Sequence, residues 1–385
     1  MSIIRSERTA AGLLLGAAAL GLLLANTPVG SGLLDLQHTT LGGGALALSV
    51  GHWISDGLLA IFFFIVAVEL KHELVAGELN SVQKAVHPAI AAIAGVIVPA
   101  GLYLAVTAGT GQQQGWPIPT ATDIAFALGV LAVFGRGLPN RLRVFLLALA
   151  VLDDLIAILI IAIFFTTNPN VLELVLAAVT VALFGVLSRM LRGRLRWPLG
   201  VLMVLLAFLS WWLVHDSGVH ATIAGVALGL AMARRPAGRV THVLEPWSNA
   251  VILPLFAFSA ALVPIPSVTP SQLSPAFWAI LVALPVGKLV GITLGGWLGS
   301  FAGRRQDRGR ISPFALLTVA ALGGIGFTVS LLMNELAFAG SAEVRAEGTL
   351  AVLLGSGVAI VVSGILVSAL ARRNRRLHPH PHPHP

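Results

Sequence analysis

The sequence contains no cysteine and few charged residues for its length. Across 385 residues there is no cysteine, and charged residues make up only 10%. Without cysteine the chain forms no disulfide and carries no thiol chemistry. Soluble domains contain about 25% charged residues, whereas 57% of this chain is hydrophobic and its mean hydropathy is +0.91. The composition therefore excludes an ordinary soluble protein and indicates one that crosses a membrane many times.

Signatures of three other protein classes are also missing. Intramembrane aspartyl proteases need a Tyr-Asp pair and a Gly-x-Gly-Asp motif, but the only tyrosine, Tyr103, lies between leucines, and no Gly-x-Gly-Asp occurs. Gly287-Lys288 is followed by Leu289 and is not part of a phosphate-binding loop, which disfavours an ATP-driven pump. Ala157 stands where a prenyltransferase-like reading of the aspartates at 153–154 would need another aspartate. We predict that the protein is not an enzyme and needs no cofactor.

Hydropathy divides the chain into twelve apolar segments, and a membrane-spanning helix needs ~20 residues. We therefore predict an all-α polytopic membrane protein with one transporter domain over residues 1–377. The alternating His-Pro tail, 378–385, is predicted to be disordered. The predicted spans are 10–26, 54–71, 86–108, 119–135, 143–165, 171–188, 197–214, 219–233, 248–263, 276–300, 314–338 and 348–371.

The lysines and arginines lie almost entirely in alternate connections between these spans. One set of connections holds clusters at 189–196, 304–310 and 372–376, whereas the opposite set holds only Arg345. Because loops on the cytoplasmic side carry the excess of positive residues, we predict that both termini are cytoplasmic. The net charge of +8 is thereby explained by topology, and nucleic acid is not needed to account for it.

The first outer loop, 26–51, contains a stretch that two structures would fit. Thr39–Val50 has three glycines, 42–44, between short runs rich in leucine, threonine and valine. This pattern fits a β-hairpin and, equally, a flexible glycine-rich loop.

Two hydroxyls and a carboxylate interrupt an apolar segment at Thr120-Ala121-Thr122-Asp123, directly after Pro117 and Pro119. Proline removes a backbone donor and restricts the preceding residue, so the helix breaks here and Thr122 or Asp123 N-caps the helix that follows. Unpaired backbone groups persist at membrane depth only where they line a cavity or meet protein. A charge at the bilayer centre costs at least ~2.5–3.5 kcal/mol, so Asp123 is a candidate functional residue.

A second break occurs at Gly323–Thr328, inside the span 314–338. Each break lies in the middle span of a group of three, spans 3–5 and spans 10–12, and the two groups enter the membrane from opposite sides. Interrupted segments at matching positions of two halves indicate a transporter site. The sequence therefore predicts inverted-topology repeats with interrupted helices at spans 4 and 11.

The remaining intramembrane charges are Asp153, Asp154 and Lys288. Adjacent residues on a helix point about 100° apart, so one aspartate can join Asp123 as a cation ligand while the other bonds to a neighbouring helix. Burial and a nearby carboxylate both favour the protonated form, and hard cations bind carboxylate, hydroxyl and carbonyl oxygens, including that of Thr122. Proton and cation would then compete for one site. The alternative is that the three aspartates only cap helices or pair with arginine or lysine.

Three roles are open for Lys288. It can form a salt bridge with Asp154 or Asp123, compensate the partial charges of helix ends at a break, or carry a proton itself. Of these we predict a structural role, with some coupling to the pKa values of the neighbouring groups.

Titratable residues gather at the ends of spans 2 and 9 on the side predicted to be cytoplasmic, and one lies at the start of span 8. Because histidine titrates near neutrality, they are candidates for a pH response; a solvated charged helix end is the alternative. For the histidine of span 8, the alternative is a helix-end histidine with its hydrogen bonds satisfied. These candidates are Glu69, His72, Glu73, His242, Glu245 and His220.

At these residues the chain resembles the NhaA-type sodium/proton antiporter family, over nearly its whole length. The most specific matches are Pro119–Gly129 and Leu152–Leu155, supported by 68–71, 217–222, 287–288 and 324–328. The resemblance implies a bacterial inner-membrane exchanger of twelve helices, with two interrupted helices crossing at mid-membrane. Sodium or lithium would leave the cell while protons enter, electrogenically and in a pH-dependent manner. A secondary transporter or channel of other cation specificity is the alternative.

The resemblance also implies roles for single residues. Asp153 would carry the cation and the proton, with Asp154 as its essential neighbour. Asp123 and Lys288 would balance half-helix dipoles, with Thr122 beside Asp123. A homodimer would form through a periplasmic hairpin matching the stretch 39–50.

The chain departs from the family pattern at a few positions. His72 stands where the family commonly has arginine, Thr241 where it has an acidic residue, and Glu245 where it has histidine. Ser259–Leu262 replaces a continuation that often contains asparagine and glycine. We expect these departures to alter the pH profile rather than transport itself.

Overall fold

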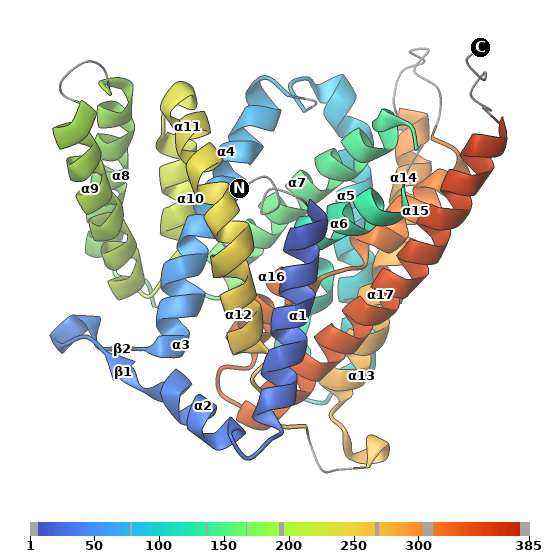
Figure 1. Cartoon of the computed structure of the whole chain (residues 1–385), viewed down its shortest axis with the longest axis horizontal. Helices are drawn as coiled ribbons and strands as arrows, with labels where there is room; N and C mark the ends of the chain where they lie inside the picture. Colours follow the sequence, from blue (N-terminus) through green and yellow to red (C-terminus); the bar gives the residue numbers. More distant parts are fainter. Residues whose placement is uncertain are drawn as a thin grey trace, which may run out of the picture.

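The chain folds into a bundle of helices (Figure 1). The computed structural model describes residues 7–77, 79–135, 138–166, 168–191, 196–265, 269–302 and 311–377. The predicted tail at 378–385 lies outside these residues, as does the arginine cluster at 304–310. The described helices are α1 (Glu7–Ala25), α2 (Gly30–His38), α3 (Val50–His52), α4 (Leu59–Val75), α5 (Val82–Val106), α6 (Ile124–Phe134), α7 (Asn140–Phe164), α8 (Val171–Arg189), α9 (Arg196–Asp216), α10 (Thr222–Ala231), α11 (Arg234–Trp247), α12 (Leu253–Ala260), α13 (Pro275–Val282), α14 (Lys288–Ala302), α15 (Pro313–Gly323), α16 (Phe327–Ala337) and α17 (Ala342–Leu377).

Membrane spans are numerous, as the composition predicted. By length and composition, nine helical segments of the described chain can cross a membrane, or eleven if two bent helix pairs each count as one span. The all-α polytopic architecture is confirmed. The count of twelve is not, because the predicted span 219–233 contains only α10, which has 10 residues.

The first outer loop contains both a helix and a pair of strands. Strands β1 (Thr40–Leu41) and β2 (Leu48–Ser49) pair antiparallel, with Thr40 opposite Ser49. Gly42 and Gly44 between them have φ angles of 96° and 60°, which glycine adopts without steric cost. Helix α2 precedes the strands in a stretch predicted as loop. The hairpin projects from the end of the bundle opposite the end of α17 (Figure 1); its position in the periplasm stays a prediction.

Both predicted breaks are present in the backbone. A short 3-10 turn, Ile118–Thr120, is followed by extended backbone from Ala121 and then by α6. In the second broken segment, α15 ends at Gly323 and α16 begins at Phe327, with a bend of 46° between them. Proline causes the first break because it lacks a donor, and the glycine run permits the second.

Helices α5 and α14 pack with their backbones in contact. Glycines recur every fourth residue on α14 and its preceding turn, and a Cβ added at Gly287 would lie 2.7 Å from Pro99 Cα. At Gly299 it would lie 2.8 Å from His87 Cδ2. Small residues at this spacing let apolar helices approach closely. This contact fixes Lys288, the first residue of α14, in the interior with none of its surface exposed.

Candidate functional site

Asp123 joins the first turns of two helices. Its Oδ1 accepts a hydrogen bond from the Phe126 amide (3.1 Å), so it N-caps α6 as predicted. Its Oδ2 accepts from the amide and the hydroxyl of Thr328 in α16, at 3.1 and 2.6 Å. Helix N-termini carry about half a positive charge each, so one carboxylate compensates two helix ends. Asp123 is 4% exposed and its hydrogen-bonding capacity is largely used.

Hydroxyls of each broken segment bond to carbonyls of the other. Thr122 donates to the Gly323 carbonyl at the end of α15 (2.7 Å), and Ser330 of α16 donates to the Ile118 carbonyl (2.7 Å). These bonds satisfy carbonyls that the helix breaks would leave unpaired at membrane depth. The crossing is therefore held by reciprocal bonds between residues about 200 positions apart.

Lys288 pairs with Asp153. Its Nζ lies 2.8 Å from both carboxylate oxygens, and both side chains are buried. A salt bridge to Asp154 or Asp123 was one of the three roles open for Lys288, and its partner is instead Asp153. The bond agrees with the expectation that one aspartate of the pair bonds to a neighbouring helix. The close packing of α14 against α5, which itself packs on α7, brings Nζ to the Asp153 face of α7.

Asp154, the next residue, is buried but makes no such contacts. It is 7% exposed, and among the described residues its carboxylate forms no hydrogen bond or ion pair. It lies three residues after Val151 and seven after Leu147, so these three share one face of α7. Val151 and Leu147 both line a cavity; Asp154 is not among the lining residues and lies one turn beyond Val151 on the same helix face.

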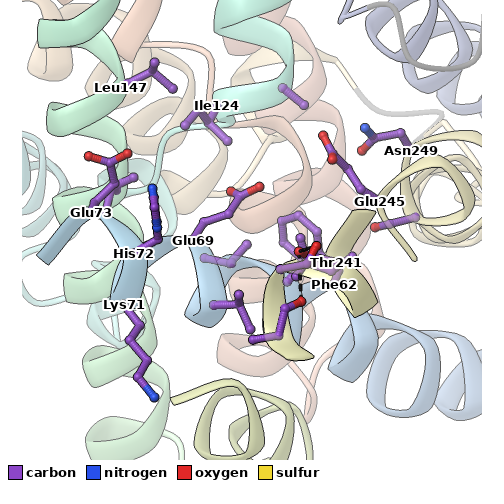
Figure 2. A pocket seen from close by; sticks show the side chains of 18 of the residues that line it. Phe62, Glu69, Lys71, His72, Glu73, Ile124, Leu147, Thr241, Glu245 and Asn249 are labelled. Atoms are coloured by element: carbon purple, nitrogen blue, oxygen red, sulfur yellow. Dashed lines mark hydrogen bonds between the residues drawn. The ribbon is translucent and has the colours of Figure 1, made fainter. Parts of the chain in front are cut away.

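The cavity has a volume of about 490 Å³ and lies between α4, α6, α7 and α11 (Figure 2). Four of the six predicted pH-response residues line it, namely Glu69, His72, Glu73 and Glu245. Lys71 also lines it, but its Nζ donates to the carbonyls of Leu230 (2.6 Å) and Met232 (2.8 Å) and so caps the end of α10. The lining holds three carboxylates against two basic side chains, those of Lys71 and Arg234, so its formal charge is slightly negative and favours cations.

Two predicted pH-response residues lie apart from this cluster. His242 is exposed on α11 and does not line the cavity. His220 Nε2 lies 3.3 Å from Asp56 Oδ1, and its Nδ1 lies 2.7 Å from the Thr222 hydroxyl. His220 thus resembles the helix-end histidine with satisfied bonds that was its alternative reading.

Several residues of the site were not singled out from the sequence as site residues. Thr328 and Ser330 are identified as site residues by their bonds to the other broken segment. Their hydroxyls directly follow a glycine break at membrane depth, and that pattern could have indicated them from the sequence. The glycine repeat at 287–299 could have been recognised from its spacing of four. Ser248 and Asn249, which line the cavity, gave no signal beyond being polar at the start of an apolar span.

Comparisons with known proteins cover almost the entire chain. The family described as Na+/H+ antiporter 1 matches residues 1–367. Na(+)/H(+) antiporter NhaA 2 of Clavibacter michiganensis is 61% identical over 381 residues, which is 97% of this chain and 93% of that protein. Na(+)/H(+) antiporter NhaA of Tropheryma whipplei strain Twist is 46% identical over 98% of both chains. The Thermobifida fusca antiporter NhaA is 41% identical over 97% of this chain and 95% of that one.

Proposed function

The chain belongs to the Na+/H+ antiporter 1 family, and from this premise we propose that Asp154 and Asp153 form the site at which Na+ or Li+ and protons compete. Membership makes the protein a multi-pass inner-membrane transporter and not an enzyme. Cytoplasmic Na+ or Li+ is exchanged for external protons by alternating access. The two ions use the same carboxylates in turn, so neither crosses without the other.

One observation carries this proposal. Asp154 is a buried carboxylate without a bonding partner among the described residues, on the helix face turned toward a cavity with acidic walls. An ionised carboxylate in that position is unfavourable unless a proton or a cation binds it. Carboxylate oxygens are suitable ligands for a hard cation. A single group therefore suffices to couple arrival of one ion to departure of the other.

Asp153 takes part through its bond to Lys288. While Lys288 holds both oxygens of Asp153, that carboxylate is not free to bind a cation. Na+ at Asp154 adds a second positive charge close to Lys288, which weakens the Asp153–Lys288 pair by repulsion. Asp153 is then released to become a second ligand. Asp123 and Thr122 hold the broken helices together and do not bind the cation directly.

Electrogenic exchange requires more protons than cations in each cycle. Asp154 offers one proton site, and the Asp153–Lys288 pair offers a second that changes when the pair opens. Reclosure of the pair after Na+ leaves on the far side completes the cycle. The two broken helices, which meet at Asp123, are the elements whose movement switches access between the two sides.

The remaining expectations agree with this scheme. We propose that the lysine- and arginine-rich connections, both termini and the cavity mouth face the cytoplasm. The β1–β2 hairpin would then lie in the periplasm. Its strand edges are free to pair with the hairpin of a second copy, and Leu41 is half exposed there. A homodimer through this hairpin is the assembly we expect.

The proposal is tested in everted membrane vesicles with an internal acid pH. Addition of NaCl to the wild-type protein should dissipate the pH gradient, with a larger effect at alkaline pH, and LiCl should do the same. Choline chloride is the control for osmotic effects. Dissipation by K+ and not by Na+ would support a different cation specificity. Cation flux without any proton movement would identify a channel and contradict the exchange mechanism.

A further inference from the structure

A turn at the junction of α11 and α12 carries polar groups that the scheme above does not use. Residues Ser248–Ile252 form a π-helical turn between the two helices. Both Ser248 and Asn249 line the cavity, and Figure 2 shows the Asn249 side chain next to that of Glu245. Ser248 is 2% exposed, and its Oγ has no hydrogen-bond partner among the described residues. A buried hydroxyl without a partner is costly, so its retention beside a cavity points to a ligand.

The backbone of the same turn adds a further oxygen. The Leu253 amide donates to the Ser248 carbonyl, five residues back, and not to that of Asn249. The next residue, Pro254, has no amide hydrogen to offer. The Asn249 carbonyl therefore lacks the intrahelical donor that an α-helix would give it. Single π-helical turns inside helices are frequent at functional sites.

The turn lies deeper in the molecule than the acidic cavity walls. Along the axis from α11 to α12, Ser248 follows Glu245 by three residues, or about 4.5 Å. Glu245 is exposed whereas Ser248 is buried, so a cation that enters the cavity meets Glu245 before Ser248. Val151 of α7 lines the same cavity, and Asp154 follows it by three residues on the same helix face.

We propose that Ser248 and Asn249 form a staging site that holds Na+ with neutral oxygens directly before it binds Asp154. This inference rests on the proposed exchange function. Hydroxyl and amide oxygens are hard ligands that suit Na+. Because they carry no net charge, they hold the ion less tightly than a carboxylate. A path that conducts ions needs sites strong enough to admit the ion and weak enough to release it.

The first test is kinetic and uses the double variant Ser248→Ala/Asn249→Ala. Losing two neutral ligands should raise the KM for Na+ from the cavity side by about fivefold to tenfold, with kcat within about twofold of wild type. Measured from the opposite side, in right-side-out vesicles, the KM should not change. Ser248→Thr keeps the hydroxyl and should keep the wild-type KM. Ser210→Ala, a buried serine on α9 that does not line the cavity, is the matched control.

Each result of this test bears on the staging site. An unchanged KM in the double variant overturns it, and so does a lost kcat with an unchanged KM, which would indicate that the turn acts mechanically. A wild-type protein without Na+-dependent exchange would instead refute the proposed function. The two failures are therefore distinguishable.

The second test does not depend on turnover. Because the chain contains no cysteine, Asn249→Cys introduces a single thiol without background. We expect a cationic methanethiosulfonate reagent to modify it from the cavity side, and Na+ but not choline to slow the modification at least about threefold. Absence of modification, or modification at the same rate with and without Na+, in a variant that still exchanges Na+ for protons would overturn the proposal.

Discussion

The crossing of the broken helices and the region beside the neighbouring cavity both contain buried polar groups, but their bonding differs. At the crossing, Asp123 accepts three hydrogen bonds, and Thr122 and Ser330 bond to the carbonyls of the opposite segment. Beside the cavity, the Asp154 carboxylate and the Ser248 hydroxyl have no partner among the described residues, although only Ser248 lines the cavity. The two regions are at similar burial. Burial alone therefore does not identify the transport site.

This difference separates two uses of a polar group inside a membrane. A group whose bonds are satisfied by protein stabilises the fold, because removing its partner leaves an unpaired group at high cost. A group left without protein partners is stabilised only when cargo binds. Asp153 belongs to both cases. Its carboxylate is bonded to Lys288, and in the proposed cycle a bound cation displaces Lys288 from it.

The largest expected effect is the loss of exchange in Asp154→Asn. Removing one partner of a buried charge interaction costs about 3–5 kcal/mol, which corresponds to at least ~100-fold in cation affinity. The melting temperature should stay near the wild-type value, because no protein bond is lost.

Asp153→Asn should also stop exchange but should lower the melting temperature, because Lys288 is left buried and unpaired. Vesicle assays and thermal unfolding in detergent measure both quantities. Equal melting temperatures for the two variants would contradict the claim that Asp153 is bonded within the protein and Asp154 is not.

A second prediction concerns the crossing itself. Asp123→Ala removes three hydrogen bonds at the ends of α6 and α16 and should destabilise the protein by about 3 kcal/mol or more. Asp123→Asn should cost less, because asparagine is also a good N-cap. Both variants should lower the melting temperature, while kcat stays close to the wild-type value. A variant Asp123→Ala with unchanged stability and no exchange would assign Asp123 to cation binding instead.

A third, smaller effect tests the packing that places Lys288. The backbone of α14 at Gly291 is in contact with the Ala94 carbonyl of α5, so Gly291→Ala should cost about 1–3 kcal/mol through overpacking. Gly16→Ala in α1 is the matched control, because nothing lies within 4 Å of a Cβ added there. The control should be neutral or should stabilise by up to ~1 kcal/mol. Chemical or thermal unfolding of the purified variants checks both values, and equal effects would refute the role of the glycine repeat.

The smallest expected effect is on the pH profile. Arginine keeps its positive charge at every pH of the assay. In His72→Arg, this permanent positive charge in the cavity should raise the KM for Na+ about twofold at pH 8. Glu245→His removes a negative charge and should raise the KM over the whole range. Superimposable KM–pH curves for both variants and the wild type would show that these positions do not set the profile.

Much of the architecture was predictable from the sequence, because hydropathy and proline or glycine breaks act locally. The interruptions at Pro119 and at Gly323–Gly326, and the N-cap at Asp123, follow from the backbone chemistry of the residues concerned. The hairpin at Thr40–Ser49 did not follow, since its composition fits a loop equally well and only the left-handed backbone at Gly42 and Gly44 decides for it.

The partners within the site were less predictable, because they depend on helix packing between distant segments. The sequence suggested Asp154 or Asp123 as the partner of Lys288, whereas the position of α14 against α5 selects Asp153. The group of pH-response candidates included His220 and His242, which the fold directs away from the cavity. Ser248 and Asn249 are not unusual as sequence, and only their place in the cavity wall draws attention to them.

The central claim is that Na+ and protons compete at Asp154 while Asp123 holds the helices. Its most direct test is Na+-induced proton release from the purified protein in a weakly buffered solution, followed with a pH indicator. The wild-type protein should release protons when NaCl is added and none with choline chloride, and Asp123→Asn should behave like the wild type. Asp154→Asn should release no protons on Na+ addition while remaining folded. Proton release of wild-type size from folded Asp154→Asn would contradict the account.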